Sequence, residues 1–217
     1  MSSELKIDFV SDVSCPWCAI GLASLEEALR RLDGEVRPQL RFQPFELNPA
    51  MPPGGQEIGE HLTGKYGTTP EQQAASREAI RQRGAEVGFE FRKEGRGRVY
   101  NTFNAHRLLH WAGLESGERQ HALKKALLKA YFTDGLSPES PEVLARAAAD
   151  AGLDAARARQ ILDTDEYADE VRAEERRFTD LGIRAVPSVI LNDRHLIQGG
   201  QPPEVFEQAL RQIAASR

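Results

Sequence analysis

The period of the hydrophobic pattern changes twice within the N-terminal part of the chain. Residues 5–10 alternate apolar and polar side chains, which predicts a short buried strand. Apolar positions then recur every three or four residues over 22–32 and stop at Gly34, as in an amphipathic helix that ends at a glycine. Alternation returns over 39–43 and predicts a second strand. We therefore expect a strand–helix–strand unit with a right-handed parallel crossover.

The long middle of the chain has a helical pattern. It follows the loop sequence NPAMPPGG (48–55), which marks a boundary. The sequence TPEQ (69–72) supplies a helix N-cap, a proline in the first turn and a capping-box glutamine. The other predicted helices are NTFNAHRLLHWAG with an end near Gly113, then 118–133, 141–151, 154–163 and a charged helix over 166–181.

The C-terminal segment returns to strand-like sequence. The stretches VPSVIL (186–191) and HLIQG (195–199) flank Asn192-Asp193, and this pattern predicts a β-hairpin. A last amphipathic helix follows. Neither end of the chain makes a stable sheet alone, so we expect the two ends to complete one another. The predicted architecture is a single α/β domain, residues 1–50 plus 172–217, interrupted by an all-α helical insertion domain over 51–171.

Composition and charge restrict the classes of function. Hydrophobic residues make up 40% of the chain and charged residues 28%, which suits a packed globular protein. The formal net charge of −5 opposes binding to a phosphate backbone. The sequence has no apolar run long enough to span a membrane, and its first residues lack the pattern of a secretory signal. We expect a cytoplasmic protein without nucleic-acid or membrane partners; the sequence does not predict its oligomeric state.

Both cysteines of the chain lie in the stretch SDVSCPWCAIG (11–21), separated by Pro16 and Trp17. They come at the start of the first predicted helix, whose free N–H groups and dipole favour a thiolate at Cys15. Two intervening residues let Cys18 reach Cys15 and form a disulfide with it. A redox dithiol is therefore favoured over an inert pair, because a CxxC beside a βαβ unit is typical of redox proteins.

A metal site is the competing interpretation of the two cysteines. A closed zinc site needs four ligands, and the chain has no third cysteine. His106 and His110 lie four residues apart on a predicted helix, but far from the CxxC in the sequence. Two further interpretations of this helix stay open. Either it is a packed helix whose histidines are at the surface or capped, or His106, or Asn101 and Asn104, faces the dithiol across the domain junction.

The sequence Val186-Pro187 opens the late predicted strand. Proline does not donate to a sheet ladder, so it belongs at the start or edge of a strand. Taken alone, this proline would only mark the start of the strand. The charged run EVRAEERRF (170–178) predicts a solvated helix face with paired charges. The aromatic residues of the insertion have two interpretations, either an apolar groove over the CxxC or core: Tyr66, Phe89, Phe91, Tyr100 and Phe103.

Taken together, CPWC at the start of a helix, a helical insertion and a Val-Pro before a hairpin resemble the thioredoxin superfamily in its DsbA-like branch. The sequences SDVSCPWCAIG, ELNPAMPPGG, NTFNAHRLLHWA, GIRAVPSVIL and GGQPPEVF are similar to those of FrnE-type thiol–disulfide oxidoreductases. The resemblance covers nearly the whole chain. It implies a thioredoxin-like fold interrupted by the helical insertion.

The resemblance also implies roles for individual residues. Cys15 would be an exposed nucleophile and Cys18 a buried resolving thiol. Pro187 would follow a cis peptide bond and pack against the dithiol. The backbone of Val186 would pair with an extended substrate segment, as in strand addition. Pro16 and Trp17 would tune the thiolate and contact substrate.

Two departures from DsbA change what we expect of the chemistry. DsbA has a buried acid six residues before its first cysteine, and Phe9 stands there in this chain, with Asp8 and Asp12 nearby. DsbA also has a histidine inside its CxxC, where this chain has Trp17, which offers the thiolate no charge. We therefore expect a Cys15 pKa well above the value of about 3.5 in DsbA. The redox potential should be more reducing than roughly −120 mV and shift toward the roughly −270 mV of thioredoxin.

The function expected from the sequence is protein thiol–disulfide exchange through a mixed disulfide. It needs no dissociable cofactor, and its substrates would be protein or small thiols and disulfides, with glutathione as a candidate redox partner. One alternative is a glutathione-dependent isomerase or transferase related to 2-hydroxychromene-2-carboxylate isomerase, although those relatives typically have serine at the first CxxC position. A non-enzyme alternative is a chaperone-like or assembly module built on the helical insertion.

Overall fold

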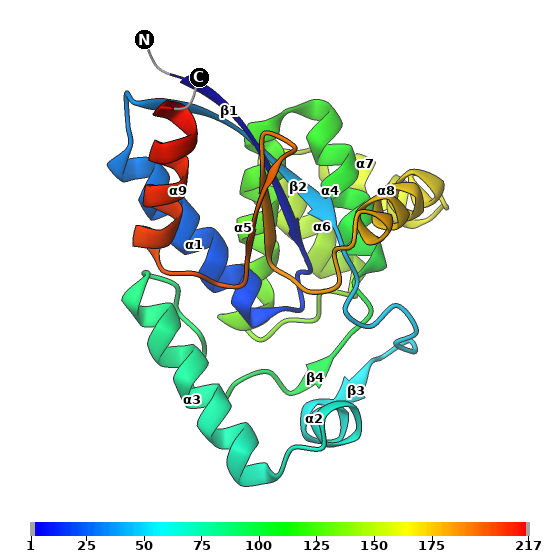
Figure 1. The fold of residues 1–217 in the computed structure, drawn as a ribbon. Coiled ribbons are helices and arrows are strands. Elements are labelled where there is room, and N and C mark those ends of the chain that lie inside the picture. Colours follow the sequence, from blue (N-terminus) through cyan, green and yellow to red (C-terminus); the bar gives the residue numbers. More distant parts are fainter. Residues whose placement is uncertain (1–2, 216–217) are drawn as a thin grey trace.

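A four-stranded sheet of order β2-β1-β5-β6 lies at the centre of the computed structural model, which describes residues 3–215 (Figure 1). β1 (Ser3–Ser11) runs parallel to β2 (Val36–Pro44), and α1 (Pro16–Arg31) connects them. The predicted parallel strand–helix–strand unit is thereby confirmed. The hairpin of β5 (Ser188–Leu191) and β6 (His195–Gln198) pairs antiparallel with β1, so the two ends of the chain share one sheet.

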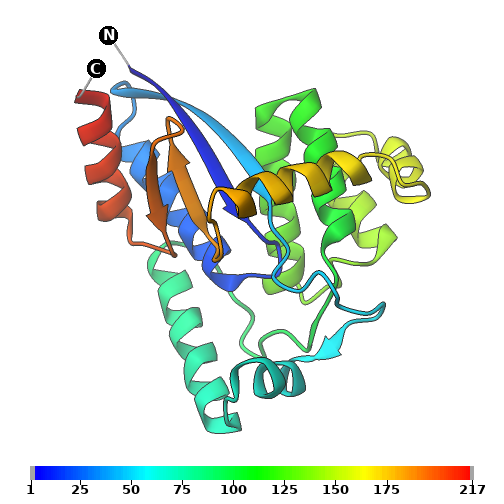
Figure 2. The same ribbon diagram turned by 45° about the vertical axis from the view of Figure 1, so that its right-hand side comes forward.

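The alternation along β1 places its side chains in two different cores. Leu5, Ile7 and Phe9 are fully buried on the face covered by α1 and by α9 (Pro203–Ala215). Val10 points to the opposite face and packs with Phe178 of α8 (Ala168–Asp180). Figure 2 shows α8 crossing the face of the sheet opposite to α1. The sheet is therefore covered by helices on both faces, as its apolar strands require.

The segment between β2 and α8 is mostly helical, as predicted. Its elements are β3 (Gln56–Glu57), α2 (Ile58–Tyr66), α3 (Pro70–Glu86), β4 (Arg98–Val99), α4 (Phe103–Glu115), α5 (Gly117–Phe132), α6 (Pro141–Asp150) and α7 (Ala155–Leu162). The capping box at the start of α3 is present, with Thr69 and Gln72 bonding each other's backbone. The two-residue ladder of β3 and β4 was not expected, because two residues are too few to give a periodic signal.

α4 ends two residues beyond Gly113, so the expected helix end near this glycine is confirmed, although the glycine itself is not the stop. The helix continues to Glu115, and Ser116 then caps α5. A Cβ atom at position 113 would lie 2.8 Å from Nε2 of Gln120, so this glycine makes room for a neighbouring helix instead of stopping its own.

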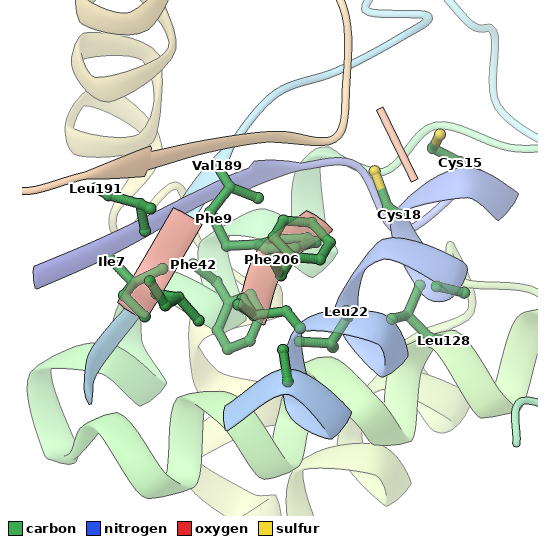
Figure 3. Packing of buried hydrophobic residues seen from close by; sticks show 14 of the residues in the cluster. Ile7, Phe9, Cys15, Cys18, Leu22, Phe42, Leu128, Val189, Leu191 and Phe206 are labelled. Atoms are coloured by element: carbon green, nitrogen blue, oxygen red, sulfur yellow. The ribbon is translucent and has the colours of Figure 1, made fainter. Parts of the chain in front are cut away.

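The helical segment shares part of the core of the sheet. Leu128, Tyr131 and Phe132 at the end of α5 belong to the same buried cluster as α1, β1 and α9 (Figure 3). A second cluster lies between α4, α5, α6 and α7. The division of the chain at residues 51 and 171 stays a prediction. No helix within 3–215 has the length and apolar character to cross a membrane.

Candidate active site

The two cysteines lie where the end of β1 meets the start of α1. Cys15 is the N-cap of the helix, and its backbone is extended (φ −93°, ψ 116°). Cys18 lies in the first turn, and its N–H donates to the carbonyl oxygen of Cys15 over 3.1 Å. Both are free thiols. Figure 3 shows them at one end of the core cluster, with Cys15 farther from Phe9 and Phe206 than Cys18 is.

The expectation of an exposed Cys15 is wrong. Its exposed fraction is 5%, against 0% for Cys18. The reason is the loop before β5: the sulfur of Cys15 lies 3.6 Å from the carbonyl oxygen of Val186. Trp17, between the cysteines, is 39% exposed. Of the two cysteines, Cys15 keeps the small exposed fraction, next in sequence to Pro16 and the exposed Trp17.

The position of Cys15 at the helix N-cap favours its thiolate. The pKa of Cys15 is lowered, first by the hydrogen bond from the Cys18 thiol and then by the backbone N–H groups of Cys18 and Trp17, although burial and the charge of Asp12 oppose this. Trp17 and Cys18 are the second and third residues of α1, the usual donors to an N-cap side chain, although the side chain of Cys15 makes no capping hydrogen bond in this structure. Burial raises the pKa of Cys18 well above its ordinary value, so the two thiols have unequal acidities.

The loop that carries Pro187 packs directly on the first turns of α1. The Val186–Pro187 bond is cis, and Pro187 is buried. A Cβ atom on Gly21 would lie 3.0 Å from Cγ of Pro187, and one on Gly200 would lie 3.0 Å from the carbonyl oxygen of Trp17. Glycines at both positions allow this close approach. The fold thus brings Val186 and Pro187 next to the CxxC, although Val186 lies 171 positions after Cys15 in the sequence.

A buried carboxylate lies beside the dithiol, but three residues before Cys15 instead of six. Phe9 fills the core, while Asp12 is 1% exposed. The carboxylate of Asp12 accepts hydrogen bonds from the N–H and hydroxyl of Ser14 (3.1 and 2.9 Å) and from the N–H of Leu47 (2.8 Å). Nε2 of His106 lies 3.5 Å from Asp12 Oδ1. Burial raises the pKa of Asp12, but His106 and these N–H groups outweigh it and bring the pKa to about 2.

The structure shows what the polar side chains at the start of α4 and just before it contact. His106 is 2% exposed and faces Asp12, so it is no surface histidine. His110 packs against the ring of Tyr167 at 5.3 Å. Asn101 accepts from the N–H of Phe103, and Asn104 accepts from Arg107, so both serve local structure. No group of three or more His, Cys, Asp or Glu side chains within 3–215 is placed to hold a metal ion.

Sequence reasoning missed two basic residues near the dithiol. Arg96 comes from an irregular loop and donates to the carbonyl oxygen of Ser14 over 2.5 Å. Lys124 lies on α5 and is fully buried. For Arg96 the sequence has no signal. For Lys124 it has one, because the helical spacing places it on the same face as Leu127, Leu128 and Tyr131, which are apolar.

The exposed fractions of side chains bear on two further predictions, one about the aromatic residues of the insertion and one about the charged run 170–178. Phe89, Phe91 and Tyr100 pack against the core, whereas Tyr66 is 59% exposed. The charged face of α8 has the expected pairs, but it is not wholly solvated. Arg172 also binds Glu46, a buried carboxylate after β2. It does so because α8 packs against β2, which brings Arg172 to the segment that follows this strand.

The solved structures similar to this chain include redox proteins. A probable DsbA oxidoreductase from Streptomyces coelicolor is 36% identical, with a TM-score of 0.89 over 98% of this chain and 91% of the other. The 2-hydroxychromene-2-carboxylate isomerase has the same fold at 14% identity, with a TM-score of 0.73 over 97% of each chain. The cytosolic disulfide reductase DsbM from Pseudomonas aeruginosa, in its structure with GSH, is 17% identical, with a TM-score of 0.67 over 97% of this chain and 99% of the other.

One family of sequences matches nearly the whole described chain. Residues 6–211 match the family described as the DSBA-like thioredoxin domain. This range begins in β1 and ends in α9, so it includes the sheet, the CxxC helix, the helical insertion and the loop with Pro187. The chain belongs to the family of DSBA-like thioredoxin domains.

Proposed function

We propose that this protein is a thiol–disulfide oxidoreductase of the FrnE type that uses Cys15 and Cys18. The single observation that supports it best is the geometry of the cysteine pair. Cys15 occupies a helix N-cap, where its pKa is lowered, and Cys18 lies behind it with a raised pKa. A more acidic outer thiol and a less acidic inner thiol are what sequential attack and resolution require.

The exchange proceeds in two displacements. The thiolate of Cys15 attacks one sulfur of a substrate disulfide, and the other substrate sulfur leaves as a thiolate. Cys18 then loses its proton and attacks the sulfur of Cys15, which breaks the mixed disulfide and releases the second substrate thiol. The dithiol gives up two electrons and becomes a disulfide, while the substrate disulfide is reduced to two thiols. The same steps in reverse oxidise a substrate.

The substrate would bind over the opening beside Cys15. Val186 lies next to the sulfur of Cys15, and its backbone is the proposed pairing partner of an extended substrate segment. Trp17 is exposed and Pro16 is half-buried beside it, so both are proposed contacts, with Pro187 as the floor. Glutathione is the proposed small redox partner, in line with the disulfide reductase whose structure contains GSH. The cytoplasm stays the predicted location.

The test is equilibration of the purified protein with glutathione redox buffers, together with insulin reduction. We expect a potential more reducing than the roughly −120 mV of DsbA. Cys15→Ala should abolish exchange, and Cys18→Ala should trap mixed disulfides on Cys15. Full cellular activity of the double Cys15→Ala, Cys18→Ala variant would instead favour a chaperone-like module. Glutathione conjugation without disulfide exchange would favour the isomerase alternative.

A further inference from the structure

Lys124 is a buried basic group that the exchange steps above leave unused. Its side chain is 0% exposed. No hydrogen-bond partner for its Nζ lies among the described residues 3–215. An unpaired lysine in the interior is costly, because burial penalises the charged ammonium form. Such a residue is unusual among buried side chains and suggests a use for its proton.

The surroundings of Lys124 connect the dithiol with a cavity. The charges of Cys18, Asp12 and Cys15 act on Lys124, with that of Cys18 the largest of the three. Lys124 and His106 also line a cavity of about 360 Å³ between β2, α4, α5 and α8. This cavity also reaches Leu114, which is 64% exposed, so it opens to solvent. Lys124 lies one turn before Leu128, which shares a buried cluster with Cys18, and Lys124 also lines this cavity. It is therefore close to a buried thiol and has a route to water.

We propose that Lys124 accepts the proton of Cys18 when the mixed disulfide is resolved, and that this cavity carries the proton to solvent. The proposal rests on the proposed function, because only disulfide exchange requires Cys18 to lose a proton. It gives the helical insertion a part in the chemistry, since α5 supplies the acceptor.

The proton transfer balances with the exchange reaction. The S–H bond of Cys18 breaks, and its proton moves to the lone pair of the neutral amine of Lys124. The Cys18 thiolate attacks the sulfur of Cys15, the bond from Cys15 to substrate breaks, and the substrate leaves as a thiolate. Lys124 then gives its proton to water in the cavity, and the substrate thiolate takes one from solvent. When the enzyme oxidises a substrate, the proton takes the opposite path.

Burial brings the proton affinities of the two groups together. It lowers the pKa of Lys124 and raises that of Cys18, so transfer between them costs less than it would in water. Asp12 is the poorer acceptor. Its pKa is about 2, and its oxygens already accept hydrogen bonds from Ser14 and Leu47. The carboxylate instead favours the positive charge that forms on Lys124.

The neighbours of Lys124 on the surrounding elements are both apolar and charged, and the charged ones influence its pKa. Helix α6, which also packs on α5, has Leu144 and alanines as its buried side chains. The titratable and charged residues that face Lys124 or its cavity are Cys15, Cys18, Asp12, Arg41, His106, His110, Glu174 and Arg177.

The test measures the pKa of Cys18 directly, in a Cys15→Ser background, by the ultraviolet absorbance of the thiolate. Lys124→Met keeps the length of the side chain and removes the amine. We expect it to raise the pKa of Cys18 by about one unit or more, the usual effect of losing a nearby opposite charge. Lys129→Met is the matched control, because Lys129 lies on the same helix but is exposed and paired with Asp134. It should leave the Cys18 pKa unchanged.

A second measurement follows the resolution of a glutathione mixed disulfide on Cys15 as pH is varied. In Lys124→Met, this rate should fall about tenfold near neutral pH and recover as pH rises, since each pKa unit is a tenfold change in thiolate. Removal of a buried amine without a hydrogen-bond partner should leave the fold at least as stable. Lys124→Gln is the second variant, for use if the Met variant does not fold. An unchanged Cys18 pKa and pH profile would overturn the role of Lys124 while exchange persists. Absence of exchange in the wild type would overturn the proposed function itself.

Discussion

At the scale of single residues, Asp12 shows how a buried charge ties stability to pH. Its pKa is lowered from 3.8 to about 2 in the folded protein. A lowered carboxyl pKa contributes stability that is fully present above the unfolded value and is lost as pH falls through the folded value. The difference corresponds to about 2 kcal/mol. We expect this contribution above about pH 4 and its loss toward pH 2.

The variant Asp12→Asn tests this linkage. Its free energy of unfolding at neutral pH should be lower by about 2 kcal/mol, and its stability should fall less steeply than that of the wild type between pH 4 and pH 2. Urea denaturation across that range measures both. Asp33→Asn, at an exposed aspartate, is the control and should leave the acid limb of the curve unchanged. Parallel acid limbs for wild type and Asp12→Asn would contradict the interpretation.

Single residues also show how much of the site could be predicted from the sequence. Cys15 and Cys18 could be predicted because their chemistry depends on local order: two cysteines with two residues between them, at the start of a helix. Asp12 was named only as a neighbour of the motif, and its role depends on His106, which comes from α4. Lys124 comes from α5. Which side chains meet beneath the cysteines is set by helix packing, and a single sequence does not give the rotation of one helix against another.

At the scale of elements, the approach of α1 to the Pro187 loop depends on a glycine. A Cβ atom on Gly21 would lie 3.0 Å from Cγ of Pro187, closer than comfortable packing allows. Gly21→Ala should therefore displace the loop and cost about 1–3 kcal/mol of stability through overpacking. It should also change the reactivity of Cys15 toward iodoacetamide, because the Val186 carbonyl moves with the loop.

The matched control is Gly64→Ala in α2. A Cβ atom at Gly64 would meet nothing within 4 Å. Alanine in an exposed helix is favoured over glycine by about 0.5–1 kcal/mol, so this variant should be slightly more stable. Thermal denaturation of both variants, with alkylation rates of Cys15, decides the matter. If Gly21→Ala behaved like Gly64→Ala, the contact between α1 and the loop would not restrict the site.

Helices and strands with a clear local sequence pattern were predictable, whereas the two-residue strands were not. The strands β1 and β2 and the helices α1 and α3 to α9 follow hydrophobic spacing and caps that are local in the sequence. The ladder of β3 and β4 has two residues on each side, so no period is visible. Gly113 correctly indicated a helix end nearby, but the sequence could not show that this glycine also makes room for Gln120 of α5.

At the scale of the whole molecule, one side chain joins the helical insertion to the edge of the sheet. β2 is an edge strand, and its outer N–H and C=O groups need partners where the strand is buried, as at Phe42. The side-chain amide of Gln120 on α5 supplies both for Phe42: its oxygen accepts from the Phe42 N–H and its nitrogen donates to the Phe42 carbonyl, each over 3.0 Å. The amide thus continues the sheet by one hydrogen-bonded pair.

Replacing Gln120 should therefore loosen the insertion that carries Lys124. Gln120→Leu fills the space but leaves the buried N–H and C=O of Phe42 unpaired, at a cost of about 1–3 kcal/mol for each group. For the two groups together we expect a loss of about 2–6 kcal/mol in the free energy of unfolding, measured by urea denaturation. Gln82→Leu, on the exposed face of α3, is the control and should be nearly neutral. Limited proteolysis should cut Gln120→Leu faster between α4 and α5 than the control. Equal stability of the two variants would mean that water replaces the amide and that the insertion is held by apolar packing alone.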